Sequence, residues 1–130
     1  MKLKIKKFKK IIDFSGSLVP FYKDKSLNQF NIKRFFFIYG KKKIDRADHA
    51  HRKCNQILIP VNGKMEVEIS NLKKIKKTLI LSDKNKNFLF VPTFHFITIK
   101  FKQEKSILLT LCDYKYDKKE YIFKKEFFNF

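Results

Sequence analysis

Two histidines separated by one residue are the part of this sequence best suited to acid–base chemistry. His49 and His51 lie in a strand-like stretch, where alternate side chains point to the same face. Gln56 follows after four intervening residues and Gly63 after six more. We expect both imidazoles to enter one cavity, with Gln56 facing them from the next strand. A pair of imidazoles can hold and transfer protons near neutral pH, so this arrangement indicates a site.

A metal centre is the main alternative interpretation of these histidines. His95 is a third imidazole, and three of them converging in one cavity would suit Zn, Fe or Ni. Gln56 cannot supply the anionic oxygen of a site with three histidines and one carboxylate, and Asp48 is expected on the opposite strand face. We therefore favour metal-free acid–base chemistry. Purely structural histidines are a second alternative.

The spacing from His49 to Gly63 is that of the first cupin motif, with glutamine replacing its glutamate. Beyond this motif, the chain resembles the dTDP-sugar 3,4-ketoisomerases in residues 8–18, 32–39, 46–53 and 113–122. The resemblance implies a metal-independent enzyme without a cofactor. It would convert dTDP-4-keto-6-deoxy-D-glucose to a 3-keto-6-deoxyhexose through an enediol, for dTDP-3-amino-3,6-dideoxy sugars. A PLP-dependent aminotransferase would receive the product, and an exchanged N-terminal strand would form a homodimer.

The resemblance also implies roles for particular residues. We expect His51 to remove the C3 proton and His49 to carry protons to or from the sugar oxygens. Tyr39 matches a family tyrosine at a strand end and would hydrogen-bond a sugar hydroxyl or the developing enediolate; a solvent-exposed position is its alternative. The residues expected to contact the substrate or its nucleotide, or to orient groups that do, are Arg34, Arg46, Lys53, Gln56, His95 and Asp113.

Three positions depart from the family pattern. Ala47 replaces a frequent glycine before the histidine pair, and Phe94 precedes His95 where many relatives have tryptophan. Ser15 replaces an arginine found in some relatives, in a segment that approaches the sugar in the family. The gluco or galacto configuration of the product is therefore left open. A dTDP-sugar epimerase and a non-catalytic sugar-nucleotide-binding module are the alternative functions.

Apolar and polar residues alternate with a period of two in short blocks separated by turn residues, which predicts an all-β protein. We predict one cupin-type jelly-roll domain over residues 1–130. The predicted strands are 32–39, 56–61, 64–70, 88–91, 94–101 and 106–112. Asn62-Gly63 predicts a two-residue hairpin between the second and third of these. Asp117 and Glu120 form a capping-box-like pattern that predicts a short C-terminal helix.

The composition excludes some functions and leaves others open. The net charge of +19 suggests nucleic-acid binding, but only three of the 31 basic residues are arginine, and A/T-rich codons account for much of the lysine. We expect no nucleic acid partner. No apolar run approaches a membrane span, and the basic N-terminus lacks the apolar segment of a signal peptide. Cys54 and Cys112 lack metal-binding spacing, and a reducing, cytoplasmic location is expected.

Overall fold

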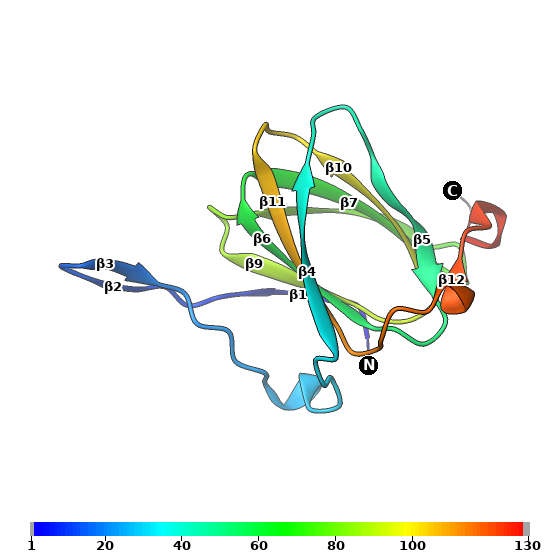
Figure 1. Cartoon of the computed structure of the whole chain (residues 1–130), viewed down its shortest axis with the longest axis horizontal. Coiled ribbons are helices and arrows are strands. Elements are labelled where there is room, and N and C mark those ends of the chain that lie inside the picture. Colours follow the sequence, from blue (N-terminus) through cyan, green and yellow to red (C-terminus); the bar gives the residue numbers. More distant parts are fainter. Residues whose placement is uncertain (1, 129–130) are drawn as a thin grey trace.

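The computed structural model describes residues 2–128, which form two facing five-stranded sheets (Figure 1). One sheet contains, in spatial order, β1 (Lys4–Lys7), β9 (Asn87–Val91), β6 (Gln56–Asn62), β11 (Ser106–Cys112) and β4 (Arg34–Gly40). The other contains β12 (Tyr121–Ile122), β5 (Arg46–His51), β10 (His95–Phe101), β7 (Lys64–Asn71) and β8 (Lys76–Ser82). All neighbouring strands are antiparallel. The predicted all-β barrel is confirmed.

The core lies between the inner faces of the two sheets. Along β7 the buried side chains Met65, Val67 and Ile69 alternate with Lys64, Glu66 and Glu68, as period-two alternation predicts. The apolar side chains meet those of β6, β9, β10 and β11 in one cluster. Burial of this apolar surface is the main stabilising contribution, at about 25 cal/mol for each Å² removed from water. The inner faces therefore carry both the core and, at one end, the site.

The six predicted strands are confirmed, but the predicted hairpin between two of them is wrong. β6 pairs with β9 and β11, whereas β7 pairs with β8 and β10. Gly63 therefore carries the chain from one sheet to the other. It has a φ of +86°, and an added Cβ would lie 2.4 Å from the Ser106 hydroxyl oxygen. The turn at Asn62-Gly63 exists, but it joins the two sheets: β7 pairs with the next strand, β8, and with β10, whereas β6 pairs with the more distant β9 and β11.

The segment before β4 covers part of the outside of the first sheet. Leu27 and Phe30, at and after the 3-10 turn η1 (Lys25–Leu27), are fully buried against residues of β6, β9 and β11. Before them, β2 (Ile11–Asp13) and β3 (Gly16–Leu18) form a two-stranded hairpin that projects from the barrel (Figure 1). Phe14 at its tip is completely exposed. This hairpin is the largest feature that sequence alternation did not predict.

β1 also differs from its expected arrangement. The family resemblance implied an N-terminal strand exchanged with a second subunit, but here β1 pairs with β9 of the same chain, from Lys4 opposite Phe90 to Lys7 opposite Asn87. The edge of the first sheet is therefore covered within one chain. β8, which begins at the lysine-rich stretch containing Lys76, is likewise an edge strand.

The chain after β11 returns to the second sheet. Asp117 caps the 3-10 turn η2 (Lys118–Glu120) by accepting from the Lys119 N–H at 3.0 Å. The expected C-terminal helix is only a further 3-10 turn, η3 (Lys125–Phe128), with β12 between the two turns. Phe128 is buried against Phe96 on the outer face of the second sheet. No helix among residues 2–128 is long and apolar enough to cross a membrane.

Candidate active site

A bulge in β5 sets the direction of the two histidines. His49 pairs with Ile97, but Ala47 pairs with Thr98, so Asp48 is the additional residue. Ala47 and Asp48 have φ values of 74° and 54°, in the left-handed region that glycine tolerates best. Asp48 is held by the Thr98 hydroxyl, which donates to its carboxylate at 2.6 Å. After this bulge the strand continues regularly, and both imidazoles lie together as predicted.

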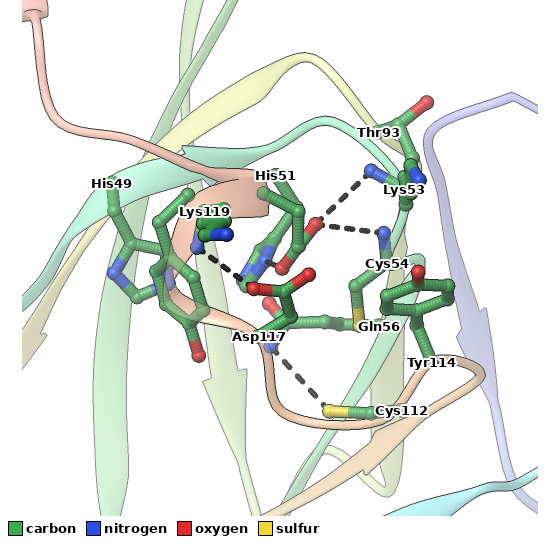
Figure 2. A network of polar contacts seen from close by, with 12 residues as sticks. His49, His51, Lys53, Cys54, Gln56, Thr93, Cys112, Tyr114, Asp117 and Lys119 are labelled. Atoms are coloured by element: carbon green, nitrogen blue, oxygen red, sulfur yellow. Dashed lines mark hydrogen bonds and ion pairs between the residues drawn. The ribbon is translucent and has the colours of Figure 1, made fainter.

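His51 is bound by a carboxylate that the sequence analysis had assigned to helix capping. Its Nδ1 contacts a carboxylate oxygen of Glu120, and both side chains are almost completely buried. The other Glu120 oxygen accepts hydrogen bonds from the main-chain N–H groups of Lys53, at 3.0 Å, and Cys54, at 3.1 Å (Figure 2). Burial opposes ionisation of Glu120, but these donors hold the pKa of its carboxyl below the ordinary value. The carboxylate thereby fixes the ring and its tautomer.

The second nitrogen of His51 is a candidate general base. With Nδ1–H donating to Glu120, Nε2 carries the free lone pair. It is buried and has no hydrogen-bond partner among residues 2–128. Burial lowers the pKa of the imidazole, while the bond to Glu120 acts in the opposite direction. A neutral histidine with an unsatisfied acceptor is therefore present at neutral pH, next to the ring of His49.

His49 is neutral as well, and burial is again the main cause. Burial and the neighbouring His51 lower its pKa to about 4. Its Nδ1 lies 2.9 Å from the Ala47 carbonyl oxygen, which requires a hydrogen on that nitrogen. The two imidazole centroids are 4.8 Å apart and nearly perpendicular. The pair thus presents two neutral rings, only one of which is bound to a carboxylate.

Tyr121 is the aromatic residue that joins the pair. Its ring centroid lies 4.4 Å from that of His51 and 4.9 Å from that of His49. Its hydroxyl oxygen accepts from Nη2 of Arg34 at 3.3 Å. Arg34 also donates through Nε to the Tyr114 carbonyl, at 3.3 Å. At least two of the guanidinium N–H groups therefore donate to protein groups, and the expected contact of Arg34 with a nucleotide stays a prediction.

A cavity of about 250 Å³ opens beside these rings, between the two sheets. The polar residues His49, Gln56 and Tyr121 are part of its wall, and Arg46 lines it from an exposed position. The remaining lining residues are mainly apolar: Phe36, Phe37, Ile38, Ala47, Leu58, Ile97, Ile99 and Thr110. A largely apolar pocket with a few convergent polar groups is typical of a small-molecule site.

Other predicted site residues support the local structure. Gln56 is buried, and its amide donates to the Cys112 sulfur at 3.7 Å instead of to a histidine (Figure 2). Asp113 accepts the backbone and side-chain N–H groups of Asn55 at 2.7 and 2.8 Å. Lys53 is exposed, with its ammonium 5.7 Å from the Tyr114 ring centroid. Asp113 thus orients a backbone segment, the role favoured over direct catalysis.

Two predicted residues do not join the histidine pair within this chain. Tyr39 is 72% exposed and lies on the face of β4 opposite to Arg34, because positions five apart on a strand point to opposite faces. His95 lines a separate cavity with Ile69 and Ser70, and its Nδ1 contacts the Thr93 carbonyl oxygen at 2.9 Å. Among residues 2–128, no group of three or more His, Cys, Asp or Glu side chains is arranged to hold a metal.

Glu120 and Tyr121 were missed as site residues. The stretch 113–122 is one of the four that resemble the ketoisomerase family, but the sequence pattern assigns Glu120 to a capping box with Asp117. Only Asp117 acts in this way. The pairing of Tyr121 with His51 across β12 and β5 brings the adjacent Glu120 to the imidazole. The sequence held the signal, but the strand pairing could not be derived locally.

Comparisons with known proteins connect the chain to one family. The family model described as "FdtA: WxcM-like, C-terminal" matches residues 1–130. A TDP-4-oxo-6-deoxy-alpha-D-glucose-3,4-oxoisomerase from Aneurinibacillus thermoaerophilus is 43% identical over 68 residues, which cover 52% of this chain and 48% of that protein. The match therefore spans about half the length of that curated relative.

Two solved structures are similar over almost the whole chain. A 3,4-ketoisomerase from Helicobacter canadensis is 30% identical, with a TM-score of 0.84 over 99% of this chain and 96% of that one. A variant of the 3,4-ketoisomerase QdtA from Thermoanaerobacterium thermosaccharolyticum, in complex with TDP-4-keto-6-deoxyglucose, is 29% identical. Its TM-score is 0.83 over 97% of this chain and 90% of that one.

Proposed function

We propose that this protein is a TDP-sugar 3,4-ketoisomerase, because the chain belongs to the family described as "FdtA: WxcM-like, C-terminal" and its structure is similar to those of 3,4-ketoisomerases. Its substrate would be dTDP-4-keto-6-deoxy-D-glucose, and its product the 3-keto isomer. The observation that carries the proposal is the buried His51–Glu120 pair beside His49 and a mainly apolar cavity. Such an arrangement can move protons between adjacent carbons out of bulk water.

The proposed reaction begins at C3 of the sugar. Nε2 of His51 removes the C3 proton, and the electron pair moves to form the C3–C4 double bond of an enediolate, with negative charge on the former C4 carbonyl oxygen. Glu120 stabilises the imidazolium that forms, because the hydrogen bond to Nδ1 becomes charge-assisted on both sides. His49 transfers a proton from the C3 hydroxyl to the C4 oxygen. Delivery of the proton on His51 to C4 then leaves the carbonyl at C3.

Access to the base requires a small adjustment. His51 is 4% exposed, and the rings of His49 and Tyr121 lie against it. A bound sugar must therefore separate these rings enough to contact Nε2. The buried nitrogen lacks a partner before binding, which costs free energy that a contact with the substrate would recover. Arg46, at the exposed edge of the cavity, is the arginine best placed to contact the pyrophosphate.

The proposed activity has a direct test. The protein is incubated with dTDP-4-keto-6-deoxyglucose and a PLP-dependent 3-aminotransferase, and the amino sugar is identified by NMR. A 3-amino-3,6-dideoxyhexose is expected, and its C4 configuration reports the gluco or galacto outcome. Recovery of the 4-keto sugar with inversion at another carbon would instead indicate an epimerase. Absence of any sugar change, with retained dTDP binding, would indicate a binding module.

His51 provides the corresponding test of mechanism. Replacement by Asn should lower the turnover rate by about 100- to 10,000-fold, the usual contribution of a positioned acid or base. Release of deuterium from C3 to solvent should fall in parallel, while dTDP binding should change little. Because the substitution also alters the buried contact with Glu120, circular dichroism must show that the variant is folded. A folded His51→Asn enzyme with most of its activity would transfer the base role to His49.

We further infer that the functional unit is a homodimer. Because β1 pairs within one chain, it gives no support for an exchanged N-terminal strand, but the β2–β3 hairpin provides another argument for a dimer. Ile12 and Phe14 are 70% and 105% exposed on a hairpin that projects from the barrel, and apolar side chains in such positions favour contact with another chain. Light scattering at micromolar concentration should give twice the mass of one chain. A monomeric mass would exclude the dimer.

A further inference from the structure

The hydroxyl of Tyr121, a residue that lines the cavity, has an unused hydrogen-bond donor. Its oxygen accepts from Arg34 at 3.3 Å, but among residues 2–128 no acceptor contacts its hydrogen. A phenol can donate and accept at the same time, so the contact with Arg34 leaves the donor free. Tyr121 lines the same cavity as His49 and Gln56. The free O–H is therefore available to a ligand atom in this cavity.

Arg34 makes this phenol a stronger donor. A cation bound to the phenol oxygen withdraws electron density and stabilises the negative charge that develops when the O–H is donated to an anion. Arg34 is itself held in place by the Tyr114 carbonyl, and its guanidinium lies 5.4 and 5.5 Å from the ring centroids of Phe36 and Tyr116. Its position is therefore fixed before a ligand binds, as electrostatic stabilisation of a transition state requires.

The protonation state of Tyr121 fits a donor. Burial raises the pKa of the phenol, although Arg34 acts in the opposite direction. The group is therefore protonated at neutral pH and would not compete with His51 for the C3 proton. Its ring contacts both imidazoles, and the residue lines the same cavity as His49.

We propose that Tyr121, polarised by Arg34, is a catalytic residue that donates its O–H to the sugar oxygen carrying negative charge in the enediolate. This inference rests on the proposed ketoisomerase function. It assigns to Tyr121 the phenol role that the sequence analysis had given to Tyr39. No proton needs to leave the phenol: the hydrogen bond strengthens as charge develops on the oxygen and weakens as the 3-keto product forms.

Tyr121→Phe is the main test, because it keeps the ring packing and removes only the hydroxyl. We expect kcat to fall about 100-fold, within the range for loss of one oxyanion donor, with KM changed less than about threefold. Deuterium release from C3 should slow to the same extent. Tyr22→Phe, at an 80% exposed position away from the cavity, is the matched control and should retain wild-type kinetics. A folded Tyr121→Phe enzyme with kcat within twofold of wild type would show that the ring only packs.

A second measurement separates this inference from the proposed function. In a His51→Asn background, which slows turnover, ¹³Cζ-labelled tyrosine is observed by NMR, and Tyr121→Phe identifies the Tyr121 resonance. Addition of dTDP-4-keto-6-deoxyglucose should shift that resonance, whereas dTDP alone should shift it much less. If the wild-type enzyme is active but the Tyr121 resonance does not shift, the inference about Tyr121 is wrong and the proposed function stands. A shifted Tyr121 in a protein without isomerase activity would overturn the proposed function and retain the contact.

Discussion

Two aromatic groups in this protein contrast with each other. The inner cluster contains His49, His51 and Tyr121, and the outer row contains Phe35, Phe37 and Tyr39 on β4. Ring centroids in the outer row are 6.4 and 6.5 Å apart, and all three side chains are largely exposed. In the inner cluster Nδ1 of each histidine and the hydroxyl of Tyr121 have protein partners. The inner cluster therefore differs from the outer row by the hydrogen bonds that hold its rings in place.

Removing the carboxylate of the inner cluster should have the largest effect. In Glu120→Gln the amide cannot stabilise an imidazolium at His51 and has one fewer acceptor for the N–H groups of Lys53 and Cys54. We expect kcat/KM to fall about 100-fold and the free energy of unfolding to fall by about 1 to 3 kcal/mol. Steady-state kinetics and urea unfolding provide the measurements. Glu126→Gln, at an exposed position in η3, is the matched control; equal behaviour of the two variants would remove Glu120 from the site.

Acid should destabilise the inner cluster. The pKa of His49 is lowered from 6.5 to about 4, so the unfolded chain binds a proton at a higher pH than the folded protein does. The associated stability is complete above about pH 6.5 and is lost as the pH falls toward 4. A tenfold change in proton affinity corresponds to about 1.4 kcal/mol, and the ring is partly exposed, so we expect a loss on the order of 2 kcal/mol. Urea unfolding of wild type and His49→Gln at pH 7 and pH 5 should show a smaller pH effect in the variant. Identical slopes would contradict the assignment.

The bulge that positions the inner cluster should tolerate glycine better than the rest of β5. Ala47 has a φ of 74°, which costs an L-residue roughly 1 to 2 kcal/mol, so Ala47→Gly should raise the free energy of unfolding by about 0.5 to 1 kcal/mol. Ala50→Gly, on the same strand with regular backbone and a fully buried methyl group, should lower it by about 1 kcal/mol. Denaturant midpoints of the two variants should move in opposite directions. Shifts of the same sign would show that the bulge is not strained.

The smallest effect is expected in the outer row. Tyr39 lies exposed on the outer face of β4, on the opposite side of the strand from Arg34, so Tyr39→Phe should change kcat/KM by less than about twofold. The same kinetic assay as for Tyr121→Phe provides the comparison. A loss of tenfold or more would mean that Tyr39 reaches a site, and within the arrangement described here that site could only belong to a second subunit.

The sequence was informative where the evidence was local. Period-two alternation predicted six strands, and the interval between His49 and His51 placed both rings on one face. The sequence could not show whether Tyr39 lies inside or outside the barrel, because alternation indicates which residues share a face but not which face is inside. It also could not place Glu120, since the short pairing of β12 with β5 joins residues about 70 positions apart. Contacts made by strand pairing at this distance carry no local pattern.

The Glu120 carboxylate also affects how relatives of this protein should be interpreted. One of its oxygens contacts a side chain that can be replaced in evolution, but the other accepts two main-chain N–H groups that every residue except proline supplies. A descendant that lost its histidines, and with them its chemistry, would still need an acid at this position to attach the end of the chain to the barrel. Retention of glutamate here is therefore weak evidence of activity among diverged sequences, whereas retention of His51 together with Glu120 is the informative pattern.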